Sequence, residues 1–197
     1  MQVALNVGYL TRPYKGESVC GDMGACWNLP HRRVMALMDG LGHGPAAHHA
    51  ARSAMQCIED NLYRNCAEIF AACNERLINS RGGVLAIAVI DMDTNMMTLG
   101  SIGNIRTILL TPQRDFRLGA SRGIVGAGYT WMPPDQMLLA QGDTVVMFSD
   151  GVDEIANVRS CLGEKNVTPQ MLAEDVLTRW GRDSDDATVL VYRHDVM

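Results

Sequence analysis

Four short acidic clusters, far apart in the sequence, constrain this chain more than any other feature. Each cluster contains an aspartate at the end, or near the edge, of an apolar run that predicts a β-strand. If these strand ends converge in the fold, their carboxylates form an oxygen-rich pocket that suits hard divalent cations such as Mg²⁺ or Mn²⁺. The clusters are Cys20-Gly21-Asp22, residues 38–44, Ser149-Asp150-Gly151 and Asp185-Asp186-Ala187-Thr188.

The composition is that of a globular chain, and we expect residues 1–197 to form a single domain. Apolar residues make up 47% and charged residues 20% of the sequence, which is enough for a substantial core. The formal net charge of −5 gives no basic footprint for nucleic acid. There is no secretion signal and no apolar run long enough to span a membrane, so we expect a cytoplasmic protein without a membrane partner. The six cysteines show no zinc spacing and are expected to stay unpaired.

Apolar periodicity predicts many strands, with helices after Pro45, over residues 67–79 and after Thr168. Short turns between strands, including the hairpin-like Gly103-Asn104, favour antiparallel pairing. Residues 119–134 are expected to be an irregular loop, and residues 153–165 a partly helical insertion. The predicted fold is therefore α+β, a four-layer α-β-β-α sandwich of two mainly antiparallel sheets flanked by helices. Predicted strands cover residues 2–9, 18–27, 34–38, 84–90, 96–102, 105–110, 115–118, 136–140, 144–148 and 187–192.

Asp39 and Asp150 each follow a five-residue apolar run and precede a glycine. A carboxylate at a strand end is able to bridge two cations, and a glycine beside it lets a backbone carbonyl approach the same ions. Taken alone, an Asp-Gly pair is also a common turn. The repetition of the pattern after two buried strands therefore supports the metal-site interpretation.

The other acidic clusters leave alternatives open. Adjacent strand residues point to opposite faces, so we expect only one of Asp185 and Asp186 to be a ligand, and a solvated acidic turn is the alternative. Asp22 lies near the middle of the predicted strand 18–27. An isolated carboxylate in that place is expected to face solvent unless it has a partner.

Two further side chains are candidates for substrate contacts. His43, in the glycine-rich turn after Asp39, is placed to act as a general acid or substrate contact, or is simply an exposed loop histidine. Arg12 precedes Asp22 in a predicted loop, and its planar guanidinium matches the geometry of phosphate.

Two cations about 3.5–4 Å apart activate a water and clamp a phosphate. We therefore expect hydrolysis of a phosphate ester without a covalent protein nucleophile.

In this order the clusters resemble the metal-dependent protein phosphatases of the 2C type, and more narrowly their bacterial SpoIIE/RsbU-like branch. The resemblance covers nearly the whole chain and includes Gly103-Asn104. Residues 18–22, 39–42, 81–83, 103–106 and 158–160 further resemble the branch members that act in stressosome feedback. The resemblance implies a β-sandwich with two Mn²⁺ or Mg²⁺ ions between the sheets. It also implies hydrolysis of phosphoserine and phosphothreonine on STAS-domain stressosome proteins, which resets a stress-signalling cascade.

The resemblance also implies roles for individual residues. Asp39 would bridge the two metals and the Gly40 carbonyl would bind one of them. Asp22, Asp150 and Asp185 would complete the set directly or through water.

The chain departs from the larger 2C-type enzymes at two places. Those enzymes carry a glutamate beside the first aspartate, where this chain has Gly21, and an early phosphate-binding arginine that no residue here clearly matches. Two alternatives to a protein phosphatase remain open: a catalytically silent phosphoprotein-docking module of the same fold, and a hydrolase of small phosphate esters.

Overall fold

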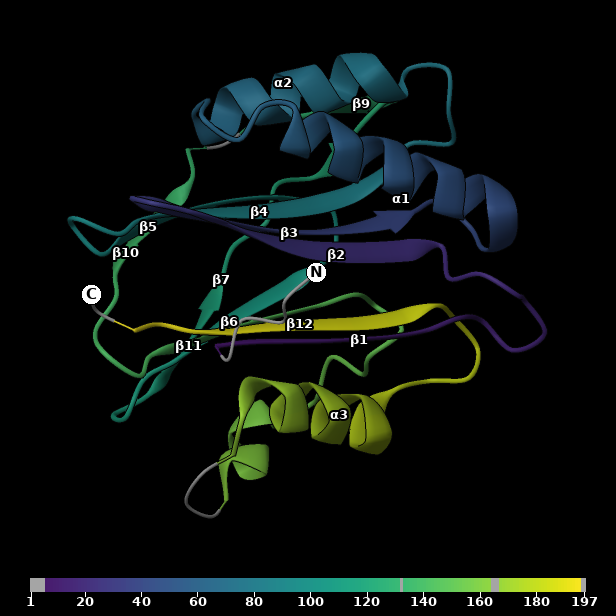
Figure 1. Cartoon of the computed structure of the whole chain (residues 1–197). Helices are drawn as coiled ribbons and strands as arrows, with labels where there is room; N and C mark the ends of the chain where they lie inside the picture. The colour runs from purple at the N-terminus through teal and green to yellow at the C-terminus, as the bar shows by residue number, and fades with distance from the viewer. Residues whose placement is uncertain (1–5, 132, 164–166, 196–197) are drawn as a thin grey trace.

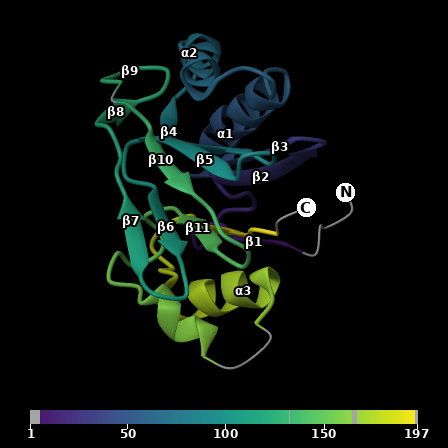
Figure 2. The same ribbon diagram turned by 90° about the vertical axis from the view of Figure 1, so that its left-hand side faces the viewer.

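The computed structural model describes residues 6–131, 133–163 and 167–195. Two five-stranded sheets lie face to face, with helices α1 and α2 outside one sheet and α3 outside the other (Figure 1). The view turned by 90° shows the same stack of four layers (Figure 2). All strand pairs within the described residues are antiparallel. The predicted α+β sandwich is confirmed.

The sheet beside α3 has the strand order β1-β12-β11-β6-β7, and the sheet beside α1 and α2 has the order β10-β5-β4-β3-β2. A short β8-β9 hairpin lies in the segment predicted to be an irregular loop. The first sheet consists of β1 (Val7–Arg12), β6 (Arg106–Leu110), β7 (Asp115–Leu118), β11 (Thr144–Phe148) and β12 (Ala187–Arg193). The second consists of β2 (Asp22–Leu29), β3 (Arg32–Gly40), β4 (Gly83–Asp91), β5 (Met96–Ile102) and β10 (Asp135–Leu138). The remaining elements are β8 (Gly123–Ile124), β9 (Gly128–Tyr129), α1 (Gly44–Glu59), α2 (Cys66–Leu77), the 3₁₀ helix η1 (Val158–Leu162) and α3 (Pro169–Trp180).

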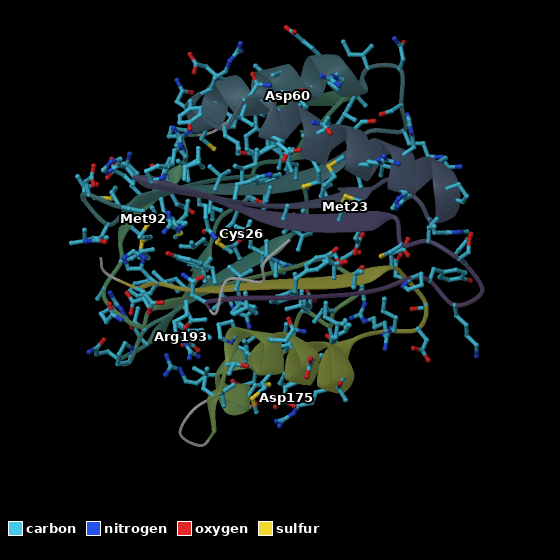
Figure 3. The ribbon with its side chains drawn as sticks, in the orientation of Figure 1. Met23, Cys26, Asp60, Met92, Asp175 and Arg193 are labelled. Carbon is cyan, nitrogen blue, oxygen red and sulfur yellow. The ribbon has the colours of Figure 1, made fainter. Side chains whose placement is uncertain are left out.

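The central strands are apolar on both faces because each lies between two other layers. On β3, Val34 and Met38 pack with the helices, whereas Met35 and Leu37 pack between the sheets. Successive side chains of a strand point to opposite faces, so residue parity decides which layer each side chain enters. Cys26 of β2 belongs to the layer between the sheets (Figure 3).

Two predicted strands lie further along the chain than expected. The predicted strand 2–9 becomes β1, which ends at Arg12 because this residue pairs with Ala187 of β12; residues 1–5 lie outside the described residues. The predicted strand 18–27 becomes β2, which begins at Asp22 because this residue pairs with Asp39. Asp22 therefore lies at a strand end rather than in the middle of a strand. Pairing with a neighbouring strand, rather than local sequence, sets both boundaries.

Two predicted turns do not join paired strands. Gly103-Asn104 connects β5 to β6, and residues 139–143 connect β10 to β11, but each connection passes from one sheet to the other. β5 pairs with β4 on one side and β10 on the other, so it has no free edge for β6. Gly103, with φ of +101°, turns the chain while its N–H donates to the Ser121 carbonyl.

Close packing of α3 on β1 depends on Gly8, where an added Cβ would lie 2.1 Å from the Pro169 carbonyl oxygen. We expect Gly8→Ala to lower the free energy of unfolding by roughly 1–3 kcal/mol, because backbone atoms must move to make room. Urea unfolding measures this change. Gly163→Ala is the matched control, since its nearest atom would be 3.8 Å away. Equal stabilities of the two variants would contradict this account of the packing.

Candidate metal centre

The acidic residues meet at one end of the space between the sheets. β2 and β3 place Asp22 directly opposite Asp39. Asp150 follows β11 and Asp185 precedes β12, and these strands are antiparallel neighbours, so both residues lie at the same end. In Figure 1 this is the end where α1 and β12 begin. Four sequence clusters thus converge as predicted.

Asp39, Asp150 and Asp185 line a cavity of about 160 Å³. Asn104 forms part of the wall, and its Nδ2 donates to Oδ2 of Asp150 at 2.8 Å. This bond fixes the orientation of the Asp150 carboxylate at the rim. The remaining wall residues are Leu41, Gly42 and Val84.

Asp22 and Asp186 lie deeper, and each is only 2% exposed. Oδ2 of Asp22 accepts a hydrogen bond from Oγ of Ser149 at 2.6 Å, and Oδ1 of Asp186 accepts one from the Tyr14 backbone N–H at 2.8 Å. Oδ1 of Asp22 and Oδ2 of Asp186 have no hydrogen-bond partner among the described residues. Leaving carboxylate oxygens buried and unpartnered is costly, and a bound cation would remove that cost.

Burial and mutual repulsion raise the pKa values of this cluster. Burial, followed by the charges of Asp22, Asp150, Asp185 and Asp186, raises the pKa of Asp39 to about 9. Burial also raises the pKa of Asp22 to about 7 and, with the charge of Asp150, raises the pKa of Asp185. Carboxylates that repel one another this strongly are neutralised either by protons or by cations.

The chemistry of the donor atoms fits a hard divalent cation, because every side-chain donor is a carboxylate oxygen. Within the described ranges, no group of three or more His, Cys, Asp and Glu side chains is close enough to hold a metal ion as it stands. The carboxylates surround a shared cavity rather than a single coordination sphere. Mg²⁺ commonly keeps several waters, so ligation partly through water is compatible with this arrangement.

Gly40 contacts α1 as well as the site. An added Cβ would lie 2.4 Å from the Ala47 carbonyl oxygen in the first turns of α1. The absence of a side chain therefore brings α1 against the end of β3.

His43 is held next to the acidic cavity. It is the residue before α1, its Nδ1 lies 2.7 Å from Oε1 of Glu17, and its ring stacks on Tyr14 with the centroids 4.7 Å apart. Its charge is among those that act on Asp185. The sequence placed His43 near the site but gave no sign of this support.

Arg12, the other candidate for a substrate contact, is not part of the cavity wall. Its Nη1 pairs with Oδ1 of Asp183 at 3.5 Å. Arg81 lies closer, because its Nη1 would be 2.8 Å from a Cβ added to Gly42 at the cavity. Sequence analysis assigned Arg81 no role in the site.

Sequence reasoning missed the side chains that support the carboxylates. Ser149 is fully buried, donates to Asp22 and accepts from the Thr188 N–H at 2.9 Å. Ser149 has the same strand parity as the inward-facing residues of β11, which was the available signal. Of the two adjacent aspartates, Asp185 lines the cavity and Asp186 does not. Asp185 precedes the strand, and its Oδ1 accepts from the Asp186 N–H at 2.9 Å.

Residues 30–195 match the family model described as Stage II sporulation protein E (SpoIIE). The chain belongs to the SpoIIE family. The phosphoserine phosphatase RsbX of Bacillus subtilis (strain 168) is 30% identical over 98 residues, which cover 50% of this chain and 49% of RsbX. Stage II sporulation protein E of the same strain is 26% identical over 204 residues, which cover 91% of this chain and 24% of that protein. The matches thus span about half of one relative and a quarter of the other.

Solved structures with the same fold include one from a study of the bacterial stressosome, with a TM-score of 0.89 and 30% identity, covering 97% of this chain and 100% of that chain. RsbX in complex with magnesium has a TM-score of 0.85 at 21% identity, covering 98% of this chain and 97% of that chain. The SpoIIE-family chain therefore has the predicted 2C-type fold.

No helix within the described ranges is long and apolar enough to cross a membrane. All six cysteines are free thiols.

The raised pKa of Asp39 predicts that the free energy of unfolding of the metal-free protein depends on pH. Its value is about 9 in the fold against 3.8 for the ordinary group. The folded state therefore holds the proton more tightly, and stability falls as the pH rises from about 4 through about 9. We expect Asp39→Asn, in chelator, to be more stable than the natural chain at about pH 8, with the difference shrinking towards about pH 4.

Thermal unfolding across this pH range measures the effect, with Asp60→Asn on the exposed helical layer (Figure 3) as control. A natural chain that is more stable than Asp39→Asn at the alkaline end would contradict the repulsion described here.

Proposed function

We propose that this SpoIIE-family chain is a metal-dependent serine/threonine protein phosphatase that acts on phosphorylated STAS-domain proteins of a stressosome, and so resets a stress-signalling cascade. The observation that carries the proposal is the convergence of Asp39, Asp150 and Asp185 on one cavity between the sheets. The relative RsbX is a phosphoserine phosphatase, and one similar structure comes from a study of the stressosome. A cytoplasmic location is consistent with such a substrate and belongs to the proposal.

In this proposal two Mg²⁺ or Mn²⁺ ions occupy the cavity, and RsbX in complex with magnesium supports this cofactor class. Asp39 would be a ligand of both ions, and the Gly40 carbonyl would be a ligand of one of them. Asp22, Asp150 and Asp185 act directly or through water. When bound, the ions supply a water of lowered pKa for attack on phosphorus and neutralise the phosphoryl oxygens.

The supporting residues hold these ligands in place. Asn104 orients Asp150 through a 2.8 Å hydrogen bond, and Ser149 orients Asp22 through a 2.6 Å hydrogen bond. Preorganised carboxylates lose less entropy when they bind a metal, and loss of such support typically costs about 10–100-fold in metal affinity.

Substrate contacts come from the rim of the cavity. We assign a phosphate contact to Arg81, which lies against Gly42, in place of Arg12, whose guanidinium pairs with Asp183. His43, with Nδ1 held by Glu17, keeps Nε2 for a substrate oxygen, either as general acid or as a hydrogen-bond partner.

The decisive test is phosphate release from a phosphorylated STAS-domain protein, with Mn²⁺ or Mg²⁺ and with excess chelator. We expect metal-dependent release that falls by at least about 100-fold in Asp39→Asn, because this variant loses the central ligand charge. Asp60→Asn, on the exposed surface, should keep full activity.

Two results would overturn the proposal in different ways. Tight binding of the phosphoprotein without release under any metal would identify a docking module. Release from a small ester such as p-nitrophenyl phosphate, without release from the phosphoprotein, would identify a small-ester hydrolase.

A further inference from the structure

The side chain of Asp186 occupies space that residue 21 leaves empty. A Cβ added to Gly21 would lie 2.6 Å from Oδ2 of Asp186 and 2.9 Å from Cβ of Ala47. Any larger residue at position 21 would therefore extend into the place of the Asp186 carboxylate. Glycine at 21 and aspartate at 186 are sterically matched.

The carboxylate of Asp186 is fixed rather than free to rotate towards solvent. Its Oδ1 accepts from the Tyr14 N–H at 2.8 Å, and the residue is 2% exposed. Its backbone is equally confined, because a Cβ added to Gly151 would lie 2.0 Å from the Asp186 carbonyl oxygen. Oδ2 is consequently held beside Gly21, where it has no hydrogen-bond partner among the described residues.

A second unpartnered oxygen belongs to the residue after Gly21. Asp22 is also 2% exposed, and its Oδ1 has no partner within the described part of the chain. Two buried carboxylate oxygens without hydrogen-bond partners among the described residues, one beside Gly21 and one on the residue that follows it, make a site for a cation rather than for a neutral ligand.

We propose that Asp186, together with Asp22, holds one of the two divalent cations, and that its carboxylate supplies, from the residue before β12, the charge that position 21 lacks. This inference rests on the proposed function, since it concerns the same metal centre. It adds a fifth carboxylate to the site and explains how a chain with glycine at position 21 keeps enough negative charge for two ions.

Calorimetric titration of the full chain with Mg²⁺ and with Mn²⁺ tests the assignment without reference to activity. We expect the natural chain to bind two ions and Asp186→Asn to bind one of them at least about 10-fold more weakly. Asparagine keeps an Oδ1 for the Tyr14 N–H and removes only the charge. Thermal unfolding in chelator confirms that the variant is folded.

Asp143→Asn is the matched control. Asp143 is 3% exposed, also has one unpartnered carboxylate oxygen, and lies at the start of β11, whereas Asp150 follows its end. Arg193 is the cross-strand partner of Thr144, the residue after Asp143. In Figure 3, Arg193 is labelled towards the end of the sandwich away from Met23, the residue after Asp22. This control should bind both ions as the natural chain does.

A rescue experiment addresses the steric match. We expect Gly21→Glu alone to weaken cation binding, because the new side chain collides with Asp186. Combined with Asp186→Ala and with Ala47→Gly, which removes the Cβ that would lie 2.9 Å away, the glutamate takes the vacated place and binding of the second ion should return to within about 10-fold of the natural chain.

Unchanged titration curves for Asp186→Asn, or a triple variant no better than Gly21→Glu, would overturn the assignment while leaving the proposed function intact. A natural chain that binds neither Mg²⁺ nor Mn²⁺ would overturn the proposed function as well.

Discussion

Repulsion between carboxylates confined at one end of the sandwich is the constraint on which the rest of this structure depends. Asp22 and Asp39 are cross-strand partners, and Asp150, Asp185 and Asp186 enter from the facing sheet. Like charges placed directly opposite one another destabilise a sheet. Burial aggravates the repulsion, as the raised pKa of Asp39 shows. An arrangement this unfavourable without a counter-charge is characteristic of a functional site.

The surrounding fold holds the carboxylates together through contacts between backbones. Gly40 lies against the Ala47 carbonyl of α1, Gly83 against the Asp39 carbonyl, and Gly151 against the Asp186 carbonyl, each too close for a side chain. These contacts fix the ends of β3 and β12 and the start of α1 relative to one another. Because backbone atoms cannot rotate away as side chains do, the site resists relaxation that would separate the charges.

The supporting hydrogen bonds come from both sheets. Ser149, from the end of β11, reaches Asp22 on β2, and Asn104, from the chain crossing between sheets, reaches Asp150. The cavity is therefore a product of the interface between two layers. Shared fold and partial sequence similarity relate the chain to RsbX and to the SpoIIE phosphatase domain. The steric match between Gly21 and Asp186 is an observation on this chain's own structure.

Apolar patterning alone predicted the four layers, and it marked which acidic clusters were able to form a metal site. Continuous apolar runs before Asp39 and Asp150 predicted strands that are buried on both faces. Such strands require a stacked arrangement of layers, because only this arrangement covers both faces of each sheet. The sequence did not determine where Asp22 lies, since the start of β2 depends on pairing with β3. Nor did it show that Gly103-Asn104 crosses between sheets, because the occupied edges of β5 are a property of the assembled sheet. The depth of Asp186, its unpartnered oxygen and the absence of Arg12 from the cavity wall likewise depend on how distant segments pack. Parity and composition are local properties of a chain, whereas strand neighbours, burial and steric fit arise only when distant segments meet.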